Sequence, residues 1–219
     1  MPMIASYSRK VSSPFEPCLS FLIKKQTFVL GSQMMNYKPT LVLMAGLPCS
    51  GKTTLARQLE KALGWPVESK DLFKAALLQT GGKMTDEEAG RVAYELLFAQ
   101  AEDLIVQKQC SIIFDTSAHR PFILENALRI VRAAGAEMKI IYCVAPRSLR
   151  LERLNKRTEA NLHYPFMLRM VTTTIEDEAE HFRHLPSNRL SINTQKPIEA
   201  CLTECLEYIY QDEKVLISQ

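Results

Sequence analysis

The stretch LVLMAGLPCSGKTTLARQL, residues 41–59, decides the fold of this chain. Its first part is a short apolar run that ends at Gly46, a pattern that predicts a strand buried on both faces. A helical pattern follows over residues 53–63 and is closed by Gly64. A buried strand, a glycine-containing loop and a helix are therefore expected in direct succession.

The loop matches the pattern Gly-x-x-x-x-Gly-Lys-Thr, from Gly46 to Thr53. Its glycines permit backbone angles that direct successive N–H groups toward phosphate oxygens, and the helix adds the positive end of its dipole. Lys52 can reach the β and γ phosphates of a nucleotide, and the Thr53 hydroxyl can coordinate Mg²⁺. The residues predicted to bind the nucleotide are Gly46, Pro48, Cys49, Ser50, Gly51, Lys52, Thr53 and Thr54.

Asp115 is the acidic residue expected to complete the metal site. It ends the apolar run SIIFD, residues 111–115, and ligands gather at the carboxyl ends of strands in parallel sheets. If this strand neighbours the first one, Asp115 lies beside the phosphate loop and holds Mg²⁺ together with Thr53. The alternative interpretation is a turn-forming Asp that caps the following segment.

Strands and helices alternate along the rest of the chain. Apolar runs predict further strands over residues 139–145 and 189–193. Capping signals and periodicity predict helices from Thr85, over 121–135, over 147–157, from near Pro165 and over 197–210. Strands separated by helices need crossover connections, which favour a parallel sheet covered on both faces. The predicted fold class is α/β, with a three-layer, doubly wound and mostly parallel sheet.

Length and composition indicate one domain with an extension in front of it. Residues 1–36 mix Ser, Pro and scattered apolar residues without sustained periodicity, so we interpret them as a loose N-terminal extension. A docked flap that uses the apolar residues between 21 and 30 is the alternative. Residues 37–219 are expected to form a single domain with one well-buried core.

Charge and cysteine usage restrict the surroundings and partners of the chain. A net charge of +3 is too small to argue for nucleic acid by itself, and no apolar run approaches the length of a membrane span. The six cysteines contain no C-x-x-C pair, so reduced thiols are favoured over a disulfide framework. With no secretion signal recognised at the N-terminus, we expect a cytoplasmic protein without membrane contact or an obligate protein partner.

Four segments, in this order, carry a family resemblance: GLPCSGKTTLARQL, ESKDLFK, IIFDT and RLERLNKR. Over about residues 38–210 the chain resembles the P-loop kinase-like family of AAA-type ATP-binding proteins. That family includes the kinase domain of polynucleotide 5′-kinases, chloramphenicol phosphotransferase and zeta-type toxins. The resemblance implies the fold of P-loop nucleoside triphosphate hydrolases and kinases, with ATP and Mg²⁺ as cofactors.

The resemblance also implies roles on the acceptor side of the nucleotide. Asp71 occupies the place of the Asp that accepts the proton of the attacking hydroxyl, and Lys74 stands where an Arg often contacts the acceptor phosphate. Thr116 follows the strand-end Asp115 as in the family. Because Asp is a favoured N-cap, Asp71 has the alternative interpretation of a cap for a helix through LFKAALLQ. Arg120, on the loop after the strand, is a further candidate for contact with the acceptor.

An arginine-rich helix is expected to act as a lid. Arg153 and Arg157 match the lid arginines of the family and are assigned to catalysis, with Arg153 also binding ATP. Arg147 and Arg150 fall on the same side of an ideal helix, which favours an anion nearby because like charges repel. The alternative is a solvated helix face partly neutralised by nearby glutamates.

These residues predict an ATP-dependent kinase, or phosphotransferase, that moves the γ-phosphoryl group to a hydroxyl. The acceptor would be a small molecule or the end of a nucleic acid, and the sequence does not choose between them. The alternative function is an ATP-hydrolysing switch or ATPase that acts on a protein partner. The presence of Asp71 at the position of an acceptor base favours the kinase.

Overall fold

The computed structural model describes residues 38–79, 84–156 and 181–211. Its strands form one five-stranded sheet in the order β2-β3-β1-β4-β5, and the neighbouring strands are parallel. The strands are β1 (Thr40–Ala45), β2 (Val67–Ser69), β3 (Ile112–Asp115), β4 (Glu137–Val144) and β5 (Leu190–Asn193). The extension predicted for residues 1–36 lies outside the described residues, so its role stays a prediction.

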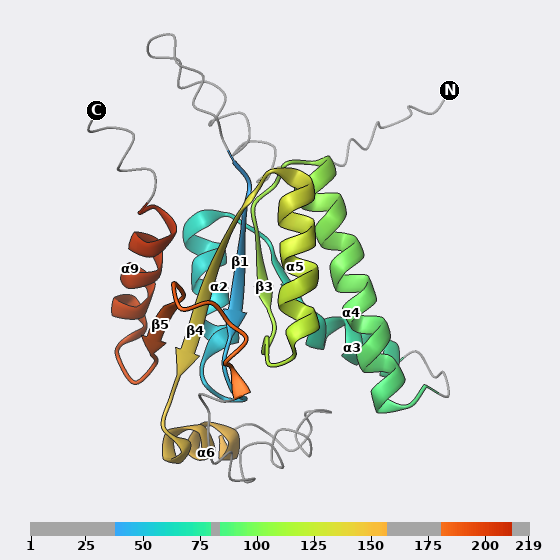
Figure 1. Ribbon diagram of the computed structural model, residues 1–219. Helices are drawn as coiled ribbons and strands as arrows, with labels where there is room; N and C mark the ends of the chain where they lie inside the picture. The colour runs from blue at the N-terminus through green and yellow to red at the C-terminus, as the bar shows by residue number, and fades with distance from the viewer. Residues whose placement is uncertain (1–37, 80–83, 157–180, 212–219) are drawn as a thin grey trace, which may run out of the picture. The chain divides into compact units, whose positions relative to one another are not determined.

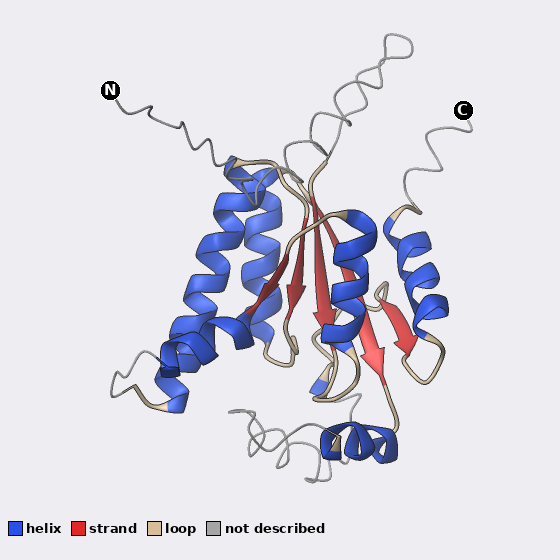
Figure 2. Cartoon of the chain, turned by 180° about the vertical axis from the view of Figure 1, so that it is seen from behind, coloured by secondary structure: helices blue, strands red, loops and turns tan. Residues whose placement is uncertain are grey.

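Helices cover both faces of the sheet (Figures 1 and 2). The helices α4 and α5 pack on one face, and α2 and α9 pack on the other. The described helices are α2 (Lys52–Leu63), α3 (Lys70–Gln79), α4 (Asp86–Glu102), the π-helix η1 (Asp103–Gln107), α5 (Pro121–Ala134), α6 (Arg147–Asn155) and α9 (Ile198–Ile209). The predicted three-layer, doubly wound parallel sheet is therefore confirmed. The helix expected from near Pro165 lies outside the described residues.

Local signals in the sequence account for the helix ends. The side chain of Thr85 accepts from the backbone N–H of Glu88, and the Glu88 carboxylate accepts from the Thr85 backbone N–H, which completes the predicted capping box of α4. Gly64 and Gly135 close α2 and α5 in the left-handed conformation that favours glycine. These signals are local, which is why they could be read without the tertiary structure.

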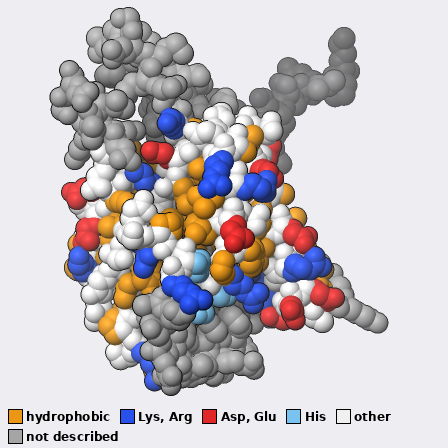
Figure 3. All heavy atoms as spheres, in the orientation of Figure 1, with side chains coloured by type: hydrophobic (Ala, Val, Ile, Leu, Met, Phe, Trp, Pro, Cys, Tyr) orange, Lys and Arg blue, Asp and Glu red, His pale blue; other side chains and the backbone are white. Residues whose placement is uncertain are grey.

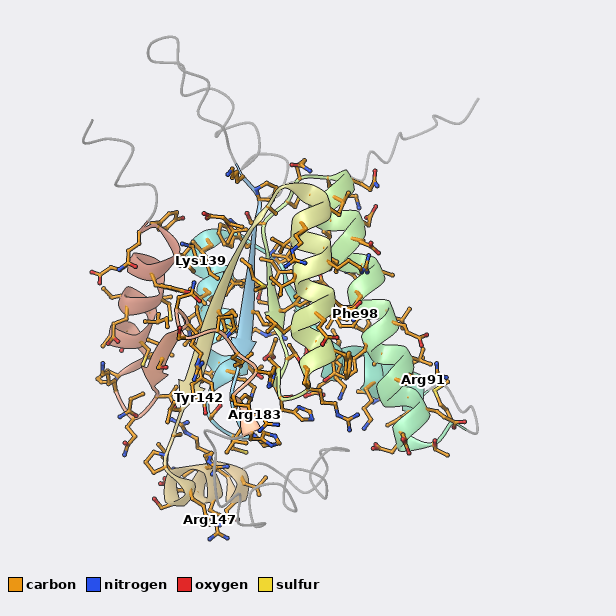
Figure 4. The ribbon with its side chains drawn as sticks, in the orientation of Figure 1. Arg91, Phe98, Lys139, Tyr142, Arg147 and Arg183 are labelled. Atoms are coloured by element: carbon orange, nitrogen blue, oxygen red, sulfur yellow. The ribbon has the colours of Figure 1, made fainter. Side chains whose placement is uncertain are left out.

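Apolar side chains from the central strands fill both layers of the core. Leu41 and Leu43 of β1 point into the layer below α4 and α5, where Phe98 of α4 packs against Phe114 of β3 (Figure 4). Val42 and Met44 of the same strand point into the layer below α2 and α9. This alternation buries β1 completely and places its carboxyl end, and the loop that follows, at one edge of the sheet.

The edge strand β2 is an element that the apolar patterns do not reveal. It has three residues, and its buried member is Glu68, whose carboxylate is hydrogen-bonded to the side chain of Gln100. Burial raises the pKa of Glu68 above its usual value. Because a buried Glu breaks the apolar run expected of a buried strand, β2 could be assigned only from its pairing with β3.

The described helices include none that is both long and apolar enough to cross a membrane.

Candidate active site

The loop between β1 and α2 has the shape of a phosphate cradle. Gly46 has φ of 132°, and a Cβ atom added there would lie 2.3 Å from the carbonyl oxygen of Cys143 on β4. The Gly46 N–H donates to the carbonyl of Ser117 at 3.1 Å, and the Ser50 N–H donates to the carbonyl of Leu47 at 3.2 Å. The tight fit against β4 and the left-handed backbone explain why glycine is needed at this position.

Lys52 is half-buried at the start of α2. Its Nζ donates to the carbonyl of Leu47 at 2.9 Å. Burial lowers the pKa of Lys52, and the nearby carboxylates of Asp115 and Asp71 oppose that shift. Lys52 therefore lies within electrostatic reach of both acidic residues that the sequence assigned to the site.

Thr53 and Asp115 meet beside the loop because β1 and β3 are neighbours in the sheet. Leu43 pairs with Phe114, so the ends of the two strands lie together. The side chain of Thr53 is hydrogen-bonded to the carboxylate of Asp115. Burial raises the pKa of Asp115, whereas this hydrogen bond and the charge of Lys52 favour the ionised form.

This pair fits the donor set of a magnesium site. Mg²⁺ is usually held by one or two protein oxygens and completes its shell with water and phosphate oxygens. Within the described residues no group of three or more His, Cys, Asp or Glu could hold a metal. A hydroxyl and one carboxylate beside a phosphate loop are therefore consistent with Mg²⁺ bound together with a nucleotide, and they do not form a closed protein cage.

Asp71 is the second carboxylate within electrostatic reach of Lys52, and it lies in the first turn of α3. Its carboxylate is 69% exposed and pairs with the Nζ of Lys70 at 3.0 Å. The helix begins at Lys70, so Asp71 lies one residue beyond the helix start and not at the N-cap position of the alternative interpretation. An exposed carboxylate within electrostatic reach of Lys52 is open to a second substrate.

Lys74 takes a different position from the one assigned by the family resemblance. It is buried between α3 and α4, and its Nζ forms a salt bridge with Asp86 at 2.6 Å. A buried ammonium that has an acidic partner joins the two helices, because removing either charge would leave the other uncompensated. The structure thus gives Lys74 a role in packing, and its contact with an acceptor stays a prediction.

Arg153 of α6 reaches the phosphate loop itself. Its Nη1 donates to the carbonyl of Cys49 at 3.2 Å and to the hydroxyl of Thr194 at 3.0 Å, and its Nη2 donates to the carbonyl of Thr194 at 2.7 Å. The Thr194 hydroxyl donates to the carbonyl of Ser50 at 2.7 Å. Arg153 and Thr194 together tie the loop to the turn after β5.

The other described arginines of α6 differ in their exposure. Arg150 is buried, and its Nε donates to the carbonyl of Ala145 at 3.2 Å. Arg147 is exposed on the side of α6 that faces away from the sheet (Figure 4). Arg147 is therefore separated from Arg150, and an anion near the arginines of α6 stays a prediction. Arg157 lies outside the described residues.

The loop after β3 carries polar groups on the acceptor side. Thr116 is buried, and its side chain and that of Ser117 are hydrogen-bonded to the hydroxyl of Tyr94 on α4. Burial raises the pKa of Tyr94. His119 and Arg120 follow on the same loop, where the sequence analysis expected Arg120.

Sequence reasoning missed Tyr94 and the role of Thr194. Tyr94 lies within an ordinary helical pattern that carries no signal for a site. Thr194 follows the strand predicted over residues 189–193. A hydroxyl at the carboxyl end of a strand in a parallel sheet was the one available signal for Thr194.

Comparison with known proteins agrees with this geometry. A family model named AAA_33 and described as an AAA domain matches residues 41–183, from β1 to the segment beyond α6. The chain belongs to this AAA domain family. The match includes every site residue proposed from the sequence, and the prediction of a P-loop kinase-like, AAA-type ATP-binding family is confirmed.

Solved structures with the same fold include several kinases. A protein from Chloroflexus aurantiacus with a provisional kinase assignment is 22% identical and has a TM-score of 0.59, with 78% of this chain and 99% of that one covered. The APS kinase CysC of Mycobacterium tuberculosis, solved with AMPPNP and APS, is 17% identical with a TM-score of 0.54, with 78% and 98% covered. At these identities the likeness shows the P-loop kinase fold.

A curated relative is the UPF0200/UPF0201 protein of Archaeoglobus fulgidus. It is 26% identical over 129 residues, which are 55% of this chain. The match spans 40% of the length of that relative.

The contacts of Arg153 predict an effect on nucleotide affinity. Because Arg153 and Thr194 hold the backbone of the phosphate loop, we expect Arg153→Ala and Thr194→Val each to weaken ADP binding by about tenfold, the scale of one lost charged hydrogen bond. Calorimetric titration with ADP and Mg²⁺ measures this. Thr203→Val, on the exposed face of α9, is the matched control. Unchanged ADP affinity in both variants would show that these contacts do not organise the loop.

His119 predicts a pH dependence of stability. Burial and nearby cations lower the pKa of His119 from 6.5 to about 4. Between pH 4 and pH 6.5 the unfolded chain therefore binds more protons at this residue than the folded chain does. The stability that the neutral His119 ring contributes is complete above pH 6.5 and is lost as the pH falls toward 4. Urea unfolding across this range should show a flatter profile for His119→Gln than for the wild type. Parallel profiles for the two proteins would contradict the assignment.

Proposed function

We propose that this protein is an ATP-dependent phosphotransferase that moves the γ-phosphoryl group of ATP to a hydroxyl of a small molecule or of a nucleic-acid end. The observation that carries the proposal is that two carboxylates, one buried and one exposed, lie within electrostatic reach of Lys52. Asp115 is buried and bound to Thr53, whereas Asp71 is exposed and borders the acceptor side. An open carboxylate at this place can take the proton of an attacking hydroxyl.

The chain's own groups would bind and orient the nucleotide. The backbone N–H groups of Gly51, Lys52 and Thr53 at the start of α2 are suited to phosphate oxygens, and the ammonium of Lys52 supplies positive charge for the β and γ phosphates. Held by Thr53 and Asp115, Mg²⁺ would neutralise phosphate charge as the transfer proceeds. The turn around Thr194, tied to the loop through Arg153, would border the base of the nucleotide.

Asp71 would act on the acceptor. The hydroxyl oxygen of the acceptor forms a bond to the γ-phosphorus. The bond from that phosphorus to the oxygen that bridges the β- and γ-phosphates breaks, and ADP leaves. The hydroxyl proton passes to the carboxylate of Asp71. The Nζ of Lys70 lies 3.0 Å from the carboxylate of Asp71 and would help to hold that carboxylate in place.

A screen of hydroxyl compounds with γ-labelled ATP tests this proposal. The panel contains sugars, sugar acids, nucleosides, amino sugars and oligonucleotides with a free 5′-hydroxyl, each incubated with protein, ATP and Mg²⁺. Label transferred to an acceptor supports the phosphotransferase. Release of labelled phosphate alone, unaffected by any acceptor, would support the ATP-hydrolysing switch instead.

A further inference from the structure

A cluster of basic and imidazole side chains beyond β3 has no part in the transfer step described above. Ser117, His119 and Arg120 come from the loop before α5, and His181 comes from the segment that precedes β5. Histidine and basic side chains gather at this edge of the molecule in Figure 3. Their hydrogen bonds and charges indicate what the cluster is built to hold.

The hydrogen bonds of His119 define its protonation. The Nε of Arg120 approaches His119 Nε2 at 3.3 Å, and an arginine nitrogen can only donate, so Nε2 is the acceptor. The proton of the neutral ring is therefore on Nδ1, which donates to the hydroxyl of Ser117 at 2.5 Å. This chain of bonds orients Arg120 through its Nε and leaves its two terminal amino groups for another partner.

Arg120 has no acidic partner in the part of the chain that the structure describes. Its one hydrogen bond there goes to His119, a neutral ring. It occupies the N-cap position of α5 and is exposed. An arginine that is held by its Nε and lacks a carboxylate can bind an anion with both terminal nitrogens, the bidentate geometry that guanidinium groups favour.

The contacts of His181 also indicate that this cluster binds a ligand. Its ring stacks on His119 with centroids 5.6 Å apart and planes 3° from parallel. The Nε2 atom of His181 is buried and has no hydrogen-bond partner among the described residues. A buried ring nitrogen without a partner is costly, and a bound ligand would satisfy it.

The charges around this cluster favour an anion. Burial is the main reason that a proton on the His119 ring is disfavoured, and Arg120, His181, Lys70 and Lys52 act in the same direction. Asp71 is the carboxylate that reaches this side, and it already pairs with Lys70. Arg120 thus retains a positive charge next to the place where the acceptor hydroxyl would meet Asp71.

We infer that the acceptor carries an anionic group, a phosphate, sulfate or carboxylate, and that Arg120 and His181 bind it. This inference rests on the proposed function and narrows its substrate class. The anionic group is not transferred: it fixes the acceptor so that a hydroxyl elsewhere on the same molecule faces Asp71. The binding of the anionic group orients the acceptor hydroxyl, and such orientation is a main requirement of phosphoryl transfer.

A titration tests the anion site without any turnover. The protein is first saturated with Mg²⁺ and the non-hydrolysable analogue AMPPNP, so that the phosphate loop is filled, and is then titrated calorimetrically with sodium sulfate, phosphate or acetate at constant ionic strength. We expect Arg120→Gln and His181→Phe to weaken binding of the preferred anion by about tenfold or more, because each removes a hydrogen bond to a charge. His181→Phe keeps an aromatic ring for the stack.

Arg91→Gln is the matched control, since Arg91 is exposed on α4, pairs with Glu95 and lies apart from Arg183 and the carboxyl ends of the strands (Figure 4). Thermal unfolding shows whether each variant is folded, and the exposed Arg120→Gln decides the result if His181→Phe is not. Equal anion affinity in Arg120→Gln and wild type, or no anion binding by the wild type, would overturn the inference.

Paired acceptors separate this inference from the proposed function. A polyol is compared with its own carboxylate and its own phosphate ester, and kcat/KM is measured for each with ATP. We expect kcat/KM for an anionic member to exceed that for the neutral one by about tenfold or more, and Arg120→Gln to remove the difference.

Equal kcat/KM for neutral and anionic acceptors would reject the anion site and leave the proposed phosphotransferase activity unchanged. Hydrolysis with no phosphorylated product would reject the phosphotransferase, while the titration still decides the anion site.

Discussion

Lys52→Ala is expected to abolish turnover and to weaken nucleotide binding by at least about a hundredfold. The residue supplies the one basic side chain of the phosphate loop between Gly46 and Thr53, and it is half-buried within electrostatic reach of Asp115. A preorganised charge directed at a transferring phosphoryl group is difficult for water to replace. Turnover is measured as ADP release, and binding by titration with ADP and Mg²⁺.

Lys61→Ala is the matched control, because Lys61 lies on the same helix and is exposed. Thermal unfolding of both variants is needed, since removal of Lys52 also leaves the buried carboxylate of Asp115 with Thr53 as its remaining close partner. Normal turnover by a folded Lys52→Ala protein would mean that this loop does not hold the transferring phosphate.

Asp71→Asn is expected to lower acceptor phosphorylation by at least about a hundredfold, the scale of a lost general base. The amide keeps the size of the carboxylate but cannot take the proton. Because Asp71 is 69% exposed and its partner is Lys70, the lost ion pair should change the free energy of unfolding by less than about 1 kcal/mol. The fold and the affinity for ATP should therefore be retained, so that the loss is one of rate.

Asp103→Asn, at an exposed Asp that also pairs with a lysine, controls for the change of charge. Labelled product is measured with an acceptor found in the screen, and ATP affinity is measured separately. Near-normal phosphorylation by Asp71→Asn would remove Asp71 from the transfer step and favour the ATP-hydrolysing switch. A loss of ATP affinity equal to the loss of rate would instead assign Asp71 to nucleotide binding.

Much of the fold could be predicted from local patterns. The run that ends at Gly46, the capping box at Thr85 and the glycine after α5 each depend on neighbouring residues alone, so they can be recognised in sequence. Predicted strand limits differ from the structure by a residue or two, as for β3, which starts at Ile112 and not at residue 111. The strand β2 was not predicted, because Glu68 interrupts the expected apolar pattern and is satisfied by a distant amide.

The candidate site also contains residues that could be assigned from the sequence and residues that could not. The residues of the phosphate loop, with Asp115 and Asp71, could be assigned because their types and spacing match a family pattern. The position of Lys74 could not, since its partner Asp86 comes from the next helix and their meeting depends on how α3 packs on α4. The arginines of α6 were grouped by helical periodicity, but the burial of Arg150 against the end of β4 set the orientation of that helix.

By itself, the sequence determined the strand–loop–helix unit of the cradle and the alternation that requires a parallel sheet, because backbone preference and apolar period act over a few residues. The tertiary structure alone decided which distant groups meet. Thr194 and Ser50 are 144 residues apart and Arg153 and Cys49 are 104 apart, yet each pair is hydrogen-bonded. Their contacts follow from the strand order β2-β3-β1-β4-β5, which brings the ends of separate strands to one edge. Strand order is set by packing of the whole chain, so no short stretch of residues encodes it.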